Sequence, residues 1–243
     1  MGLWSKIKKA AKKVWRAVKA VVRVVLRVIV TVVMAGINAF DLLLGFFNWP
    51  RKKLTLHIVV LSKLTDAQRK QVGTDLQASI DTAKRILSER FNVKLRPYAA
   101  QYVEFFTGPV PPKALTPSCC GADLLGQEFI SSGEFYAQHT AGWVGIPISL
   151  RFPITVFIVD DVQCKQGCSN GPLADYVVAE TGGLNNPGEP HPHSLMMHEM
   201  GHACSLWHST GKSNIMYKHS DRGDGSKWFQ SNLLRSSRHV TYW

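Results

Sequence analysis

The sequence predicts a mixed α/β (α+β) domain over residues 54–243, preceded by a membrane-associated segment over residues 1–53. After residue 53, β-branched apolar runs alternate with amphipathic helical runs. Before it, charge is concentrated: residues 1–53 hold twelve Lys and Arg and one acid, whereas residues 54–243 hold seventeen and sixteen. The near-neutral second part lacks the concentrated basic surface that nucleic-acid binding needs, so no nucleic-acid partner is expected.

The first half of the basic segment has the pattern of an amphipathic helix. Its cations recur at spacings of three and four residues between 6 and 27, opposite apolar side chains and tryptophans. Such a helix suits an anionic surface, so membrane lipids are the expected partner of residues 1–50. The opening "GLWSKIK" also resembles the start of dermaseptin-type cationic membrane-active peptides. That resemblance implies an alternative function, a membrane-disrupting effector helix carried by the second domain.

An apolar run of 23 residues follows, from 28 to 50, interrupted by Asp41. A bilayer core requires about 20 residues, so the run predicts a single-pass transmembrane helix. The charge bias places the N-terminus in the cytoplasm and the second domain outside it, with secretion as the alternative. An exported domain would suit two disulfides, with their pairing left open, among Cys119, Cys120, Cys164 and Cys168.

Within the second domain, the expected strands are 54–62, 93–106, 153–162 and 174–181. The capping-box pattern "TDAQ" at 65–68 predicts the start of a long amphipathic helix. A further helix is expected after Ser194, and a C-terminal helix within 226–240. The stretch 164–172 is rich in turn-forming residues and is expected to be a loop.

The stretch "HEMGHACSLWH" at 198–208 predicts a metal site. His198 and His202 are four residues apart and share one helix face, where two imidazoles can bind one zinc ion. Glu199 follows the first histidine and is placed to act on a water as a general base rather than as a ligand. A catalytic zinc needs three protein ligands and an open position, and His208 supplies the third if the chain turns back after His202.

This pattern, with Met216 eight residues after His208, resembles the metzincin metalloproteases and among them the matrixins. The resemblance implies a twisted mixed sheet with a long helix, an active-site helix and a C-terminal helix. It also implies an endopeptidase that hydrolyses polypeptides through a zinc-activated water, with Glu199 as general base and Met216 as an apolar floor. Ser205 departs from the pattern, because it replaces the family's glycine, and we expect it to adopt a left-handed conformation.

Weaker signals concern substrate binding and additional ligands. By the resemblance, the substrate lies along an edge strand, for which the candidate is the stretch containing Tyr176, Val177 and Val178. An inactive zinc-binding homologue is an alternative, although the intact Glu199 argues against it. Four further residues are interpreted as solvated or capping side chains rather than as ligands of a second metal: His191, His193, Asp160 and Asp161.

Overall fold

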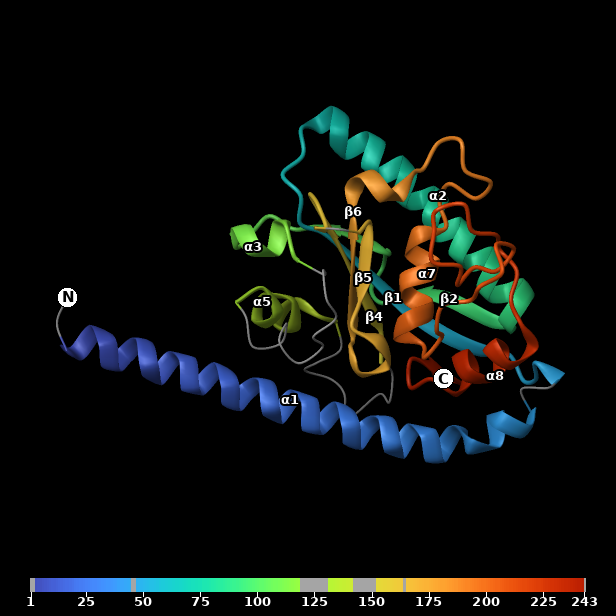
Figure 1. Ribbon diagram of the computed structural model, residues 1–243, viewed down its shortest axis with the longest axis horizontal. Helices are drawn as coiled ribbons and strands as arrows, with labels where there is room; N and C mark the ends of the chain where they lie inside the picture. Colours follow the sequence, from blue (N-terminus) through green and yellow to red (C-terminus); the bar gives the residue numbers. More distant parts are fainter. Residues whose placement is uncertain (1–2, 45–46, 119–130, 142–151, 164, 243) are drawn as a thin grey trace.

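The computed structural model describes residues 3–44, 47–118, 131–141, 152–163 and 165–242. Its centre is a mixed sheet with the strand order β2-β1-β4-β6-β5 (Figure 1). The strands of this path are β1 (Lys52–Val60), β2 (Val93–Pro97), β4 (Ile154–Val159), β5 (Gly167–Ser169) and β6 (Tyr176–Glu180). Only β5 runs antiparallel to its neighbour in this path. The predicted mixed α/β class is confirmed.

Two short strands also pair with β1. The β3 strand (Val103–Phe105) pairs in parallel beyond β2, and β7 (Val240–Thr241) pairs antiparallel near the start of β1. The predicted strand at 93–106 is therefore two strands, β2 and β3, that meet different parts of β1. Proline at position 97 ends β2, since proline cannot continue a hydrogen-bonded ladder.

Successive apolar side chains along β1 and β4 belong alternately to two hydrophobic clusters. Leu56, Ile58 and Val156 belong to the larger cluster, whereas Val59 and Phe157 belong to the smaller one. Because successive side chains of a strand point to opposite faces, the clusters occupy the two faces of the sheet.

The helices α2 (Asp66–Phe91) and α7 (Leu195–Ala203) contribute to the larger cluster. The helices α3 (Pro112–Leu115) and α5 (Ser131–His139) contribute to the smaller one. Thr65 caps α2 in the predicted capping box with Gln68. The predicted C-terminal helix is α8 (Trp228–Ser236), and two 3-10 turns, η2 (Gly171–Leu173) and η3 (Thr181–Leu184), flank β6.

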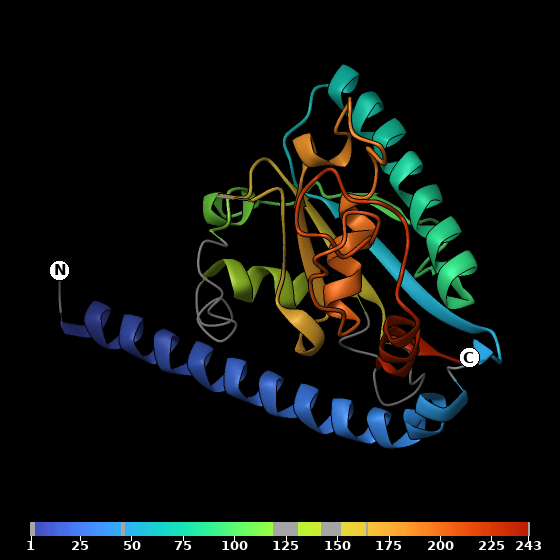
Figure 2. The same ribbon diagram turned by 45° about the vertical axis from the view of Figure 1, so that its right-hand side comes forward.

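The N-terminal segment forms one helix, α1 (Leu3–Leu44), which lies along one side of the domain against α8 and η2 (Figures 1 and 2). The predicted single-pass topology is wrong: in the described part of the chain, no helix combines the length and the apolarity needed to cross a membrane. The apolar run instead carries Asn38, which is buried against protein. Its side-chain amide donates to the Ser236 carbonyl (3.2 Å) and accepts from Lys52 (3.1 Å).

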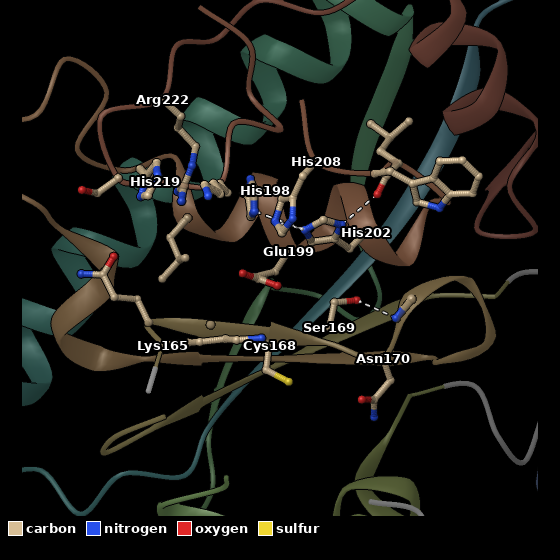
Figure 3. A pocket seen from close by; sticks show the side chains of 18 of the residues that line it. Lys165, Cys168, Ser169, Asn170, His198, Glu199, His202, His208, His219 and Arg222 are labelled. Carbon is tan, nitrogen blue, oxygen red and sulfur yellow. Dashed lines mark hydrogen bonds between the residues drawn. The ribbon is translucent and has the colours of Figure 1, made fainter. Parts of the chain in front are cut away.

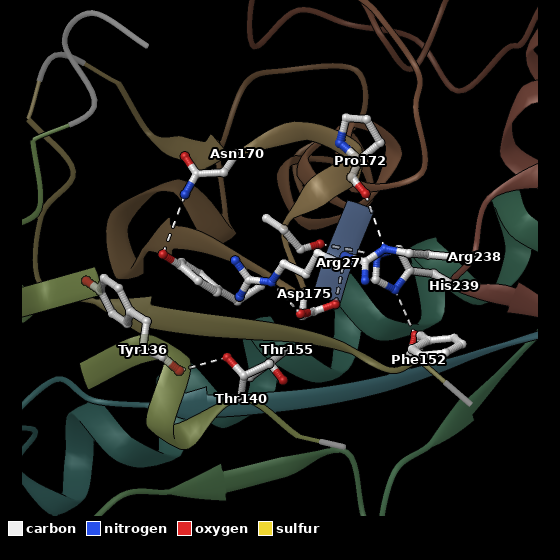
Figure 4. A network of polar contacts seen from close by, with 12 residues as sticks. Arg27, Tyr136, Thr140, Phe152, Thr155, Asn170, Pro172, Asp175, Arg238 and His239 are labelled. Atoms are coloured by element: carbon white, nitrogen blue, oxygen red, sulfur yellow. Dashed lines mark hydrogen bonds and ion pairs between the residues drawn. The ribbon is translucent and has the colours of Figure 1, made fainter. Parts of the chain in front are cut away.

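A buried ion-pair network joins α1 to the sheet (Figure 4). Asp175, just before β6, pairs with Arg27 of α1 at 2.8 Å and with Arg238 at 2.7 Å. His239 lies beside this network and hydrogen-bonds the carbonyls of Phe152 (2.7 Å) and Ala174 (3.2 Å). Arg27 therefore belongs to the protein interior and not to a lipid-facing stripe.

Candidate metal centre

The helix α7 places the first two histidines of the motif. It begins after Ser194 and ends at Ala203, so His198 and His202 lie one turn apart on the face directed towards β5 (Figure 3). Eight of the helix's nine residues are buried, which fixes its rotation against the sheet and α2. The orientation of the two imidazoles thus follows from how the helix packs.

Ser205 ends this helix in the left-handed conformation expected from the sequence, with φ of 70°. The Ser205 amide donates to the His202 carbonyl (3.0 Å), and the Leu206 amide donates to the Gly201 carbonyl (2.9 Å). These two bonds form a Schellman motif, a helix ending that usually has glycine at the position of Ser205. The reversal carries the chain back so that His208 faces the other two histidines.

The three imidazoles converge on one point. The Nε2 atom of His202 lies 3.2 Å from that of His198 and 3.1 Å from that of His208. Tetrahedral zinc with bonds of 2.0–2.1 Å would separate its ligand nitrogens by about 3.3 Å, so the spacing fits one zinc ion. Among the described residues, this is the one cluster of three potential metal ligands.

Backbone carbonyls fix the tautomer of the two helical histidines. Nδ1 of His198 donates to the Ile215 carbonyl (2.9 Å), and Nδ1 of His202 donates to the Leu206 carbonyl (2.8 Å). A protonated Nδ1 leaves Nε2 with a free lone pair directed into the site. Burial lowers the pKa of His198 to about 2 and that of His202 to about 4, so both rings are neutral near pH 7, as metal ligands must be.

Met216 packs against α7 beside Gly201, which lies between His198 and His202 in the helix. A Cβ atom at Gly201 would lie 2.5 Å from the Met216 sulfur, so the absence of a side chain in the helix admits the thioether. The Met216 carbonyl accepts from the Ser209 amide (2.8 Å), and its amide donates to the Asn214 side chain (2.9 Å). These bonds hold the 208–216 segment in a compact loop under the site.

Glu199 lies between α7 and β5, with its carboxylate facing the strand (Figure 3). A Cβ atom at Gly167 would lie 2.8 Å from Oε1 of Glu199, so a side chain at this strand position would require the carboxyl to shift. Burial raises the pKa of Glu199 to about 7, against the opposing effect of the positive charges of Arg222 and Lys165. A carboxyl with such a pKa can both accept and return a proton near neutral pH.

The edge of the sheet beside this site is β5, and not the strand expected from the sequence. The candidate residues Tyr176, Val177 and Val178 lie in β6, which is paired with β4 on one side and β5 on the other, and all three are buried. The prediction that this stretch is an edge strand is therefore wrong. The turn-forming residues of 164–172 predict a loop, but the stretch contains β5. A three-residue strand with glycine has no periodic signal by which the sequence could reveal it.

The remaining candidates do not join the metal centre. Nδ1 of His193 hydrogen-bonds the Leu184 carbonyl (2.9 Å), and His191, Asp160 and Asp161 are not part of the described ligand cluster. Of the five cysteines, Cys204 is a buried free thiol. The expected disulfides are among Cys119, Cys120, Cys164 and Cys168. The first three lie outside the described residues, so the pairing stays a prediction.

The fold and the site together define a mixed α/β protein with a cluster of three histidines that could hold one metal ion. No protein-family model and no curated protein matches the sequence.

Two solved structures resemble the chain, at low identity. Metalloproteinase-II from Bacteroides fragilis has a TM-score of 0.41 and 11% identity over 75% of this chain, which spans 55% of that protein's length. A zinc-dependent peptidase from Methanocorpusculum labreanum has a TM-score of 0.38 and 14% identity over 74% of this chain and 99% of its own. Likeness at these TM-scores does not bear on the chemistry of the site.

Proposed function

We propose that the protein is a zinc-dependent endopeptidase. The observation that carries this proposal is the convergence of three Nε2 atoms beside a buried carboxyl at the wall of an open cleft. The cleft has a volume of about 770 Å³, and β5 forms one of its walls. Three ligands leave one tetrahedral position open, which distinguishes a catalytic zinc site from a structural one.

A bound zinc ion would polarise the scissile carbonyl and acidify a water molecule. Glu199 has the role of general base: it accepts the proton of the attacking water and delivers it to the leaving amine nitrogen. Its raised pKa suits both transfers. The carbonyl partners of His198 and His202 keep the two rings oriented throughout.

The substrate is proposed to bind in extended form along the outer edge of β5. Among the described strands β5 pairs only with β6, so its other edge is where the backbone of another chain could add. Strand addition supplies main-chain hydrogen bonds that do not depend on substrate side chains. It would also hold the peptide bond opposite Glu199, which lies against Gly167.

The test uses the full chain, metal analysis and a mixed peptide library. We expect one zinc per chain, peptide cleavage that chelation abolishes and zinc restores, and a loss of turnover of about 10²- to 10⁴-fold in Glu199→Gln with zinc retained. His208→Ala should lose zinc affinity by about 100-fold or more, while the matched control His191→Ala should not. Full activity of metal-free protein would refute the proposal. Zinc binding without any peptide cleavage would favour the inactive homologue.

We also propose that α1 contacts an anionic lipid surface along its length. Some of its cations pair with the domain, Arg16 with Glu134 at 3.0 Å and Arg27 with Asp175, whereas Lys6, Lys8, Lys9, Lys12 and Lys13 are exposed. Its apolar side is left exposed, including Trp4 and Trp15, which are 75% and 62% exposed. Contiguous exposed apolar side chains mark interaction sites, and tryptophans suit the lipid interface.

Co-sedimentation of the full chain with anionic vesicles tests this second proposal. We expect binding that falls strongly in a Trp4→Ala/Trp15→Ala variant and with zwitterionic vesicles. Release of an entrapped dye would indicate membrane disruption, whereas binding without release would indicate surface attachment. Equal recovery with and without vesicles would refute lipid contact.

A further inference from the structure

Arg222 is a buried cation at the wall of the cleft. Its side chain is 3% exposed, and it lines the same cavity as the three histidines and Glu199. Its Nε donates to the Tyr217 carbonyl (3.2 Å), and Nη1 donates to the Ser194 hydroxyl (3.4 Å). Within the described residues, the ion pairs include none between Arg222 and a carboxylate.

The carboxylates near Arg222 do not form an ion pair with it among the described contacts. Asp221 pairs with Lys212 at 2.9 Å, and Glu189 accepts a hydrogen bond from the Ser220 hydroxyl (2.8 Å). The charge of Glu199 raises the pKa of Arg222, against the larger lowering by burial. Glu199 is, however, the proposed general base and must exchange its proton during the reaction.

Apart from Glu199, the charged side chains that line the cleft are cationic. Lys165 and Lys218 line it together with Arg222, and Glu199 is the one carboxylate among the described lining residues. Arg222, His219 and Lys165 lie towards one end of the cleft and Asn170 towards the other (Figure 3). Arg222 and His219 therefore lie on the same side of the three histidines.

A buried guanidinium without a counter-charge is costly, and the group that matches its planar donors is a carboxylate. We propose that Arg222 binds a substrate carboxylate on one side of the scissile bond. This inference rests on the proposed peptidase function. The carboxylate belongs either to an Asp or Glu side chain or to the free C-terminus of a short substrate, and both present the same group.

Six matched peptides distinguish these sources. Four have blocked ends and carry Glu or Gln next to the cleaved bond, one such pair for each side of the bond. Two carry neutral side chains and end one residue after the cleaved bond as a free acid or as an amide. In one pair we expect the acid peptide to have a kcat/KM about 10- to 100-fold higher than its amide counterpart, because a charge-assisted hydrogen bond contributes that much. The preference should occur on one side of the cleaved bond only.

Variants separate the guanidinium from general positive charge. In Arg222→Gln the acid-to-amide ratio should fall towards one, and Arg222→Lys should recover part of it. Lys218→Gln removes an exposed cation of the same cleft, and Arg69→Gln removes an arginine of α2 outside the cleft. Both should keep most of the ratio. Equal losses in Lys218→Gln and Arg222→Gln would overturn the assignment to Arg222.

Binding to zinc-loaded Glu199→Gln tests the inference without turnover. Calorimetry should show the same preference for the acid peptide, and it should be lost in the Glu199→Gln/Arg222→Gln double variant. Cleavage with no preference for any acid refutes the carboxylate site and leaves the peptidase intact. An acid preference in binding, without cleavage by the wild type, refutes the peptidase and leaves the carboxylate site intact.

Discussion

The sulfur of Met216 occupies the space that a side chain at position 201 of α7 would need. A Cβ atom at Gly201 would lie 2.5 Å from Sδ and 3.2 Å from Cε of Met216. Because position 201 is glycine, Met216 can pack directly against α7. This contact joins the helix that carries His198 and His202 to the loop that follows His208.

Gly201→Ala should lower both zinc affinity and the free energy of unfolding, because Met216 must move and the loop moves with it. Overpacking of this kind costs about 1–3 kcal/mol. Gly73→Ala in α2 is the matched control: nothing lies within 4 Å of its Cβ position, and alanine should stabilise the helix by about 0.5–1 kcal/mol. Chemical unfolding and zinc titration measure both effects. If Gly201→Ala gains stability as Gly73→Ala does, the contact has no energetic weight.

Ser205→Gly should stabilise the protein by about 1 kcal/mol while zinc binding is retained. Ser205 has a φ of 70°, a conformation that costs an L-residue roughly 1–2 kcal/mol and costs glycine little. Ser205→Ala retains the Cβ atom and should show no such gain. Thermal and urea unfolding of the three proteins, with zinc content measured in each, check the prediction. A gain in the alanine variant equal to that of glycine would contradict it.

Metal-free wild type should lose stability relative to Glu199→Gln as the pH rises from about 5 to about 8. Burial raises the folded-state pKa of Glu199 from 4.5 to about 7, so its contribution is present below pH 4.5 and is lost as the pH rises through 7. The relative loss is at most about 3 kcal/mol, at about 1.4 kcal/mol per pKa unit. Urea unfolding of chelator-treated protein at several pH values measures it. A difference between the two proteins that does not vary with pH would show that Glu199 titrates normally.

Arg27→Leu should destabilise the protein by about 3–5 kcal/mol, because it removes a partner of the buried Asp175 carboxylate. Arg16→Leu, in the same helix, breaks a pair that is 43% exposed on the arginine side and should cost less than about 1 kcal/mol. Chemical unfolding of both variants tests the contrast, and equal costs would contradict it.

The acid dependence of this network has a definite sign. Burial alone would raise the pKa of Asp175, but Arg238 and Arg27 together lower it. The stabilisation is therefore present above the unfolded-state value of 3.8 and is lost as the pH falls below it.

The sequence by itself determined the features that depend on local periodicity and spacing. The capping box at Thr65, the buried run of β4 and the helix carrying His198 and His202 all follow from short patterns. So does the left-handed Ser205, because His208 can meet the other two histidines only if the chain reverses after His202. These features require contacts only within one or two turns of chain, which the sequence encodes directly.

Only the tertiary structure decided which strand forms the edge and what α1 packs against. Strand order depends on pairing between distant segments. The apolar pattern of β6 therefore did not reveal that the three-residue β5 pairs outside it and forms the edge. The apolar run of α1 resembled a membrane span, but Asn38 and Arg27 have partners contributed by α8, Lys52 and Asp175. Arg222 likewise lines the same cleft as Glu199 only in the folded chain, and no neighbouring residue in the sequence marks it as part of the cleft. Long-range contacts of this kind have no local signature, because the partners meet only once the whole core has packed.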